Sequence, residues 1–335
     1  MDLFQNPFFI LGVGPRSTRS EIMDAAEAAG LSGDPDAVAD AASALASPRK
    51  RLNAEVFFLP GMRKDAADRL LAAFKGPVRM MQPCRQMSDC AAVNLTAAAL
   101  ARLTADGASR VAYGISLLSR AFELVKAPEL MGLINGDRKV AGLPAVPSVA
   151  DVEEELDKLR LHCRTVVRGA LDKLVSRELV KAAAEAARTE TDDGKRPPPV
   201  LVRDMMEIYD LESRPFFEKE EKTVKALCAA LKAAGTDRRQ SWKALAVADD
   251  LEKVLANWQS VAAPLLTIGR STGVTHRPSF LVAREVREVS VGIHNGGGDP
   301  AVTKRVTAIL AKAFAEVSEV KEAADMDAVA LGGLR

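Results

Sequence analysis

The stretch VEEELDKLRLHCRTVVRGALDKL, residues 152–174, indicates the fold class more clearly than any other part of the sequence. Its apolar side chains recur at steps of three and four residues, the 3.5-residue period of helices that pack along a coiled-coil-like seam. These positions are Val152, Leu156, Leu159, Cys163, Val166, Ala170 and Leu174. The pattern predicts a long helix from about residue 150. The same seam would serve for pairing within the chain or with a second copy in a homo-oligomer.

The composition extends the helical reading to the whole chain. Apolar residues make up 48% of the 335 residues and aromatic residues only 4%, so Ala, Leu and Val must build most of the interior. Ala and Leu favour helices, whereas strands favour β-branched and aromatic residues. The sequence therefore predicts an all-α protein, and its length predicts more than one packed unit.

Charge and cysteine usage restrict the environment of the protein. The 46 Lys and Arg residues nearly balance the 45 Asp and Glu residues, so no overall field favours nucleic acid or an anionic membrane. Cys84, Cys90, Cys163 and Cys228 lack a C-x-x-C spacing, which is typical of free thiols in a reducing compartment. No apolar run approaches the roughly 18 residues of a membrane span. We expect a cytoplasmic protein without membrane contact.

Helix-start signals divide the N-terminal part. Thr18 and Glu21 form a capping-box pair, and Asp34-Pro35 and Ser47-Pro48 each resemble an N-cap followed by the first helical residue. The last of these patterns ends at Pro60-Gly61, a pair that breaks helices. These signals predict a compact unit of three short helices.

Four segments follow from these boundaries. Residues 1–61 form the N-terminal module, and residues 62–190 form a helical domain that includes the long helix. Residues 191–199, TDDGKRPPP, form a proline-rich linker or loop, since three prolines cannot continue a helix. Residues 200–335 form a C-terminal helical domain.

The N-terminal module resembles a degenerate J-domain of the DnaJ-like family. Asn6-Pro7-Phe8, Leu11-Gly12-Val13, Ile22 and the run from Leu45 to Arg51 carry this resemblance, which covers residues 6–61. It implies a DnaK-type chaperone as partner. The C-terminal domain is also similar to helical regions that adjoin J-like modules in bacterial proteins. The residues that carry this second similarity are Trp258, Pro264, Ser271, Gly273, Arg284, Arg287 and Asn295.

The module departs from the J-domain family at its functional turn. The family has a His-Pro-Asp signature between its second and third helices, whereas Gly33-Asp34-Pro35-Asp36 stands here without a histidine. The family's basic second helix is replaced by one that carries Glu21, Asp24 and Glu27. This reversal of charge opposes a similar docking, so the residues predict that the chain does not stimulate a DnaK-type ATPase.

The candidate partner-binding residues come from three short segments of the module. The first is the turn in place of the signature, the second is a basic cluster, and the third is an apolar segment that either docks the module on the body or exposes a partner surface. The basic cluster is also consistent with a solvated helix face. These residues are Asp34, Pro35, Asp36, Arg49, Lys50, Arg51, Phe57 and Phe58.

The sequence contains no recognisable catalytic, metal or cofactor motif, so no residues are assigned to catalysis, to a metal or to a cofactor. The predicted function is that of a non-catalytic protein-interaction or adaptor protein. One alternative is a nucleic-acid-associated protein that uses residues 48–51 with Lys195-Arg196 and Arg238-Arg239. The other is an enzyme or small-molecule binder with a pocket in the helical body, near Trp242, Trp258 and Arg287.

Overall fold

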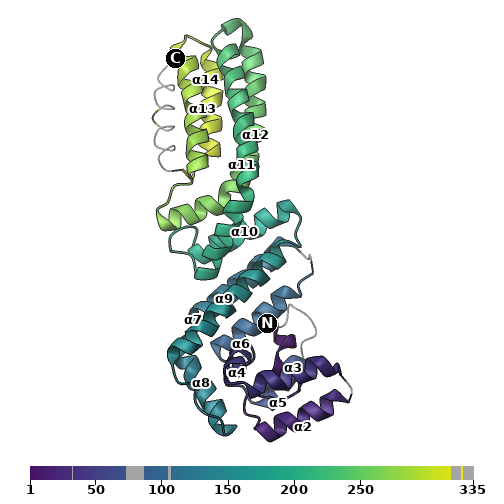
Figure 1. Cartoon of the computed structure of the whole chain (residues 1–335). Helices are drawn as coiled ribbons and strands as arrows, with labels where there is room; N and C mark the ends of the chain where they lie inside the picture. Colours follow the sequence, from purple (N-terminus) through teal and green to yellow (C-terminus); the bar gives the residue numbers. More distant parts are fainter. Residues whose placement is uncertain (32, 73–86, 105–106, 318–325, 327–335) are drawn as a thin grey trace. The chain divides into compact units, whose positions relative to one another are not determined.

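The computed structural model of the chain describes residues 1–31, 33–72, 87–104, 107–317 and 326 (Figure 1). Over these residues the regular secondary structure is helical and contains no strand, which confirms the all-α prediction. The chain divides into two compact units. Unit 1 comprises residues 1–182 and 199–205, and unit 2 comprises residues 183–198 and 206–335.

Unit 1 contains one 3-10 helix, nine α-helices and the adjoining ends of two helices that continue into unit 2, counted over the described residues. They are η1 (Leu3–Gln5), α1 (Pro7–Ile10), α2 (Arg19–Gly30), α3 (Pro35–Ala46), α4 (Pro48–Val56), α5 (Lys64–Ala72), α6 (Asp89–Ala101), α7 (Ala108–Leu124), α8 (Ala127–Val140), α9 (Val149–Leu171), α10 (Ser176–Thr191) and α11 (Val200–Gly235). Residues 1–61 are part of this unit and are not separated from the helices that follow.

The predicted helix starts are present in unit 1. Thr18 and Glu21 form the reciprocal capping box of α2. Asp34 is the N-cap of α3, and its carboxylate accepts a hydrogen bond from the Asp36 N–H. Ser47-Pro48 begins α4 without a side-chain cap bond. The sequence predicted these helix starts because a capping residue and the groups that it bonds lie within three positions of each other.

Helix α6 lies at the centre of unit 1. Nearly all of its residues from Cys90 to Leu100 are buried, and it packs against η1, α7 and α9. A helix that is apolar all round belongs in an interior. Its one buried amide, Asn94, donates hydrogen bonds to the carbonyl oxygens of Val56 and Phe58 at 2.7 and 2.8 Å. Asn94 therefore joins α6 to the C-terminal end of α4.

The seam that indicated the fold class forms part of α9. Val152, Leu159, Cys163 and Val166 are all buried there. Helix α9 packs against α4, α6, α7 and α8, all within unit 1. The apolar face of α9 is therefore covered inside this unit by several helices.

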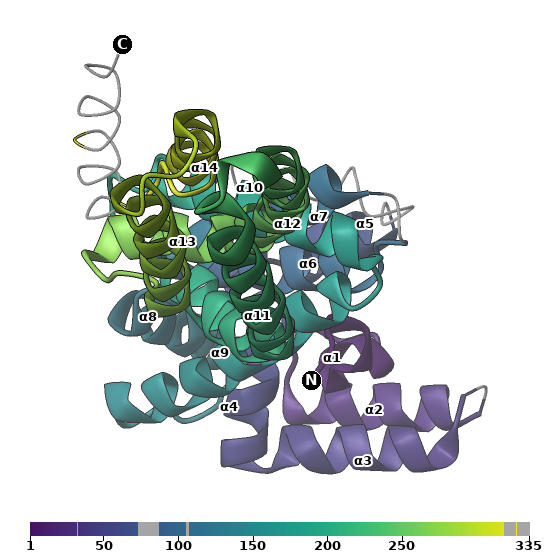
Figure 2. The ribbon, with the colours of Figure 1, turned by 90° about the horizontal axis from the view of Figure 1, so that it is seen from above.

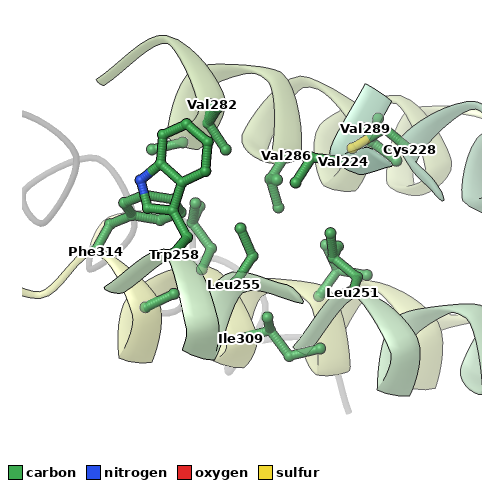
Figure 3. Close-up of a cluster of buried hydrophobic side chains, with 14 of the residues drawn as sticks. Val224, Cys228, Leu251, Leu255, Trp258, Val282, Val286, Val289, Ile309 and Phe314 are labelled. Atoms are coloured by element: carbon green, nitrogen blue, oxygen red, sulfur yellow. The ribbon is translucent and has the colours of Figure 1, made fainter. Parts of the chain in front are cut away.

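In the described part of unit 2, the core lies between α11 and the three α-helices that follow it in the chain. Besides the remaining parts of α10 and α11 the unit contains η2 (Arg238–Gln240), α12 (Ser241–Thr272), α13 (Arg277–Asn295) and α14 (Pro300–Ala313). Figure 3 shows the core: Leu255 and Trp258 of α12 face Val286 of α13, with Ile309 of α14 below them. All four side chains are at least 98% buried. Apolar burial of this extent is the main driving force for packing such helices.

The proline-rich segment between α10 and α11 begins with an ordered turn. The Gly194 N–H donates to Thr191 Oγ1 at 2.9 Å, and Asp192, Asp193 and Gly194 adopt positive φ values. A Cβ atom on Gly194 would lie 3.1 Å from the carbonyl oxygen of Thr267. Glycine is therefore required here both by the left-handed backbone and by the close approach of α12.

Candidate partner-binding surface

The turn that replaces the J-domain signature lies on the surface of unit 1. Asp34, Pro35 and Asp36 are all exposed. The Asp34 side chain caps α3, and Pro35 occupies the first helical position. The structure thus brings these three candidate residues together at the tip of the α2–α3 hairpin.

The α2–α3 hairpin, residues 19–46, leaves most of α2 uncovered. Helix α2 packs mainly against α3, and the two lie side by side in Figure 2. Ile22 is the one fully buried residue of α2. Met23 is 52% exposed and Leu31, which follows the helix, is 91% exposed. Met23 lies near the start of α2 and Leu31 lies beside the exposed turn, and both large apolar side chains are available for contact with another molecule.

The exposed charges of this hairpin are mostly negative. Asp24, Glu27, Asp36 and Asp40 are exposed, and none of them forms an ion pair with another described residue. Arg19 is the hairpin's single basic side chain. Carboxylates of one sign on one surface create a negative potential that attracts basic partners and repels acidic ones. The acidic second helix expected from the sequence is therefore presented to solvent.

The basic cluster of α4 is divided between surface and interior. Arg49 and Lys50 are exposed. Arg49 pairs with Glu154 of α9 at 2.6 Å, and this hydrogen bond raises the pKa of the guanidinium. Arg51 is buried, with 4% exposure. The three residues consequently do not form one phosphate-binding surface, because Arg51 points into the unit.

Arg51 belongs to a buried ion cluster with Glu55 of α4 and Arg138 of α8, which we call the Glu55 cluster. Arg51 Nε lies 3.0 Å from Glu55 Oε1, and Arg138 Nη2 lies 2.8 Å from Glu55 Oε2. Arg51 Nη2 also donates to the Pro15 carbonyl oxygen at 2.9 Å. All three charged side chains are at least 94% buried. The cluster joins α4 to α8, and it was not predicted because its partners lie 83 residues apart in the sequence.

Phe57 and Phe58 lie in the interior of unit 1. They are 3% and 2% exposed. The Phe58 ring packs against Phe8 at 5.4 Å between centroids, and the Phe57 ring meets His162 of α9 edge-on at 5.8 Å. Of the two uses considered for this segment, the packing corresponds to docking against the rest of the unit. Aromatic contacts of this kind stabilise a core beyond their buried area.

Apart from residues 48–51, which belong to unit 1, the aromatic and basic residues named for the alternative functions belong to unit 2. Trp258 is buried in the core, whereas Trp242 is 67% exposed. Arg238 and Arg239 are exposed in η2, and Lys195 and Arg196 are exposed in the turn before α11. Arg287 is partly buried on α13. The two tryptophans therefore do not line a common pocket.

The cysteines in the described residues are buried thiols. Cys90, Cys163 and Cys228 are free and buried, and Cys84 lies outside the described residues. Burial raises the pKa of Cys90, and raises the pKa of Cys163 and of Cys228 to about 12. A thiol must ionise to act as a nucleophile or a metal ligand. These side chains are therefore suited to packing.

The described part of the chain holds no group of three or more His, Cys, Asp or Glu residues arranged to bind a metal ion. Within the same residues no helix is long and apolar enough to cross a membrane. Comparison with protein-family models, with curated proteins and with solved structures finds no match to this chain.

Proposed function

We propose that the chain is a non-catalytic protein-interaction or adaptor protein and that the α2–α3 hairpin is its partner-binding surface. One observation carries this proposal: α2 packs mainly on α3, leaving Met23, Leu31 and a group of unpaired carboxylates exposed on one hairpin. Apolar anchors surrounded by charge are the usual composition of a partner-binding surface.

The charge of the hairpin specifies the kind of partner. Asp24, Glu27, Asp36 and Asp40 favour a protein surface rich in Lys and Arg, with an apolar site for Leu31. Exposed charges are screened by salt, with a Debye length of about 8 Å at physiological ionic strength. Association should therefore slow as salt is added, whereas contacts made by Leu31 should persist.

The relation to J-domains remains part of the proposal. The resemblance of residues 6–61 supports co-chaperone-like ancestry, but Asp34-Pro35-Asp36 lacks the histidine and α2 is acidic. We expect the full chain to leave the single-turnover ATP hydrolysis rate of a DnaK-type chaperone unchanged. Acceleration of that rate by the chain, abolished by Pro35→Ala, would show that the module keeps a co-chaperone activity.

Charge reversal tests the hairpin more cleanly than deletion of residues 1–61. Deletion would remove Glu55, leaving Arg138 buried without its partner, and would expose α6. We therefore compare the wild type with Asp24→Lys/Glu27→Lys. The matched control, Glu207→Lys/Glu218→Lys, makes the same charge change at exposed, unpaired positions of α11.

The measurement is affinity capture from cytosol at two salt concentrations, quantified by mass spectrometry. We expect at least one basic partner to be captured by the wild type and by the control and to be lost with Asp24→Lys/Glu27→Lys. Equal capture by all three proteins would show that the hairpin is not the binding surface.

A further inference from the structure

A pocket of about 270 Å³ lies in unit 2 where three helices end. Arg270 comes from the last turn of α12, His276 precedes α13, and Glu316 follows α14. Leu266 and Val317 supply apolar wall. The volume is near the lower end of ligand sites, so the pocket suits a small molecule.

Two glycines shape the rim of this pocket. Gly273 takes a left-handed conformation, and the Val274 N–H then donates to the Gly269 carbonyl oxygen at 2.9 Å. A Cβ on Gly269 would collide with the carbonyl oxygen of Val274. The chain turns sharply after α12 as a result, and this turn brings His276 to the pocket.

A hydrogen-bond relay orients the His276 ring. The Trp258 Nε1–H can only donate, and it donates to Ser279 Oγ at 2.9 Å. Ser279 Oγ also lies 2.8 Å from His276 Nδ1, so the hydroxyl proton of Ser279 is free to donate to that nitrogen. Burial lowers the pKa of His276, which favours the neutral ring. In the tautomer in which Ser279 donates to Nδ1, the other ring nitrogen, Nε2, carries the proton and can donate to a ligand.

Two polar atoms of the pocket residues lack a partner among the described residues. His276 Nε2 and Glu316 Oε2 are both buried and make no hydrogen bond. Glu316 Oε2 lies 3.6 Å from Arg270 Nη1, beyond the 2.7–2.9 Å typical of a charge-assisted hydrogen bond. The Arg270 guanidinium and the Glu316 carboxylate are therefore close, but each can still form hydrogen bonds with a ligand. The two atoms are buried although the Arg270 and Glu316 side chains are 36% and 37% exposed, so a polar ligand that enters from the surface could satisfy them.

We propose that this pocket binds a small zwitterion of the α-amino acid class with an apolar side chain. Arg270 and the His276 Nε2–H would bind the carboxylate, and Glu316 would bind the ammonium group. Leu266 and Val317 would contact the apolar side chain. A zwitterion pairs with all three polar groups of the pocket, the Arg270 cation, the Glu316 anion and the His276 donor. A simple anion would leave the Glu316 carboxylate without a partner. This site is independent of the α2–α3 hairpin and does not rest on the proposed partner binding.

The test begins with thermal unfolding of the full chain in the presence of each standard L-amino acid at millimolar concentration. A ligand that binds only the folded state raises the unfolding temperature with concentration. We expect small apolar amino acids, such as valine or leucine, to do so. Isothermal titration calorimetry then measures the dissociation constant of the strongest of these, and of its two analogues that lack the amino or the carboxylate group.

Three variants assign the site. We expect Arg270→Gln and Glu316→Gln each to weaken amino acid binding about tenfold or more, since each removes a charge-assisted contact. Arg277→Gln, at an exposed position of α13 beside the pocket residues, should bind as the wild type does. The deaminated analogue should bind weakly, and Glu316→Gln should not weaken it further. Circular dichroism establishes that each variant is folded.

Two results would overturn the proposal. One is the absence of saturable binding by any amino acid to the folded wild type. The other is binding of inorganic phosphate or the deaminated analogue as tightly as the amino acid, with Glu316→Gln tightening it, which would define an anion site.

Discussion

The two units bury their polar groups in different ways. In unit 1 the interior contains full charges: Glu55 lies between Arg51 and Arg138, and Asp137, which is 3% exposed, pairs with Arg16 at 2.7 Å. In unit 2 the core shown in Figure 3 is apolar, and its buried polar contacts are hydroxyl bonds such as Ser290 with Thr307. Removing one member of a buried ion pair leaves an unpaired charge, whereas removing an apolar side chain leaves a cavity.

This difference suggests what each unit is built to do. The Glu55 cluster joins the short helices of residues 1–61 to α8, so these helices are held as part of a larger body while the α2–α3 hairpin stays uncovered. A rigid support with one exposed hairpin fits a partner-binding role. In the unit 2 core of Figure 3, apolar side chains from successive turns of the long helices supply the packing instead.

The largest effect is expected from Glu55→Ala. It leaves Arg51 and Arg138 buried without a counter-charge, so the free energy of unfolding should fall by about 3–5 kcal/mol. Circular dichroism during denaturation measures this loss. Trp242 and Trp258 both lie in unit 2, so their fluorescence transition should move less than the dichroism transition.

A triple replacement refines this prediction. Arg51→Met, Glu55→Leu and Arg138→Met together remove the whole cluster, and stability should return to within about 1–2 kcal/mol of the wild type or exceed it. If the triple variant stayed as unstable as Glu55→Ala, the cluster would contribute stability beyond the mutual neutralisation of its three charges.

Leu255→Ala probes the apolar core of unit 2. Leu255 is fully buried, so its truncation should lower the free energy of unfolding by about 2–5 kcal/mol. Here the tryptophan fluorescence transition should shift at least as far as the dichroism. A shift confined to dichroism would contradict the assignment of this residue to the core around Trp258.

Gly298→Ala tests the turn between α13 and α14. A Cβ at this position would collide with the carbonyl oxygen of Gly235 and with Ile293. We expect a loss of about 1–3 kcal/mol, typical of overpacking. Gly296→Ala is the comparison, because its Cβ would lie 3.2 Å from the Gly292 carbonyl oxygen and 3.3 Å from the Thr236 methyl group, tight contacts but not collisions. Equal losses in both variants would argue against close packing at Gly298.

Acid should weaken unit 1 through His162. Burial, assisted by the N-terminal ammonium group, lowers the pKa of this side chain to about 4, whereas Asp2 opposes the shift. The unfolded chain, with a histidine pKa of about 6.5, therefore takes up the proton first as the pH falls. The free energy of unfolding should decrease by about 1–2 kcal/mol between pH 6.5 and pH 4, after allowance for partial exposure. His162→Phe, which keeps a ring against Phe57, should lose this part of the pH dependence.

Charge reversal in the hairpin should have the smallest effect on stability. Asp24→Lys/Glu27→Lys changes exposed positions without ion pairs, so the free energy of unfolding should stay within about 0.5 kcal/mol of the wild type. A larger loss of stability would mean that these two carboxylates stabilise the folded chain, which the proposed partner-binding role does not require.

The sequence predicted the features that depend on near neighbours. The capping box of Thr18 and Glu21, the N-cap Asp34 and the helix that begins at Ser47-Pro48 are all present, since a few residues determine each. The burial of Arg51 was not predictable, because a Pro-Arg-Lys-Arg run is typical of a solvated face. Its partner Glu55 is shared with Arg138, which lies 83 residues further along the chain from Glu55. The His276 relay was missed for the same reason: Trp258 and Ser279 come from different helices.

The proposed function depends most on the α2–α3 hairpin being the surface that meets a partner. The direct measurement is photo-crosslinking in cytosol from a photoreactive residue placed at Glu27, compared with the same residue at Glu207 of unit 2, both exposed. We predict a specific adduct with a basic protein from position 27 that salt weakens, and none from position 207. Adducts of the same composition from both positions, or an adduct from position 207 alone, would contradict the proposal.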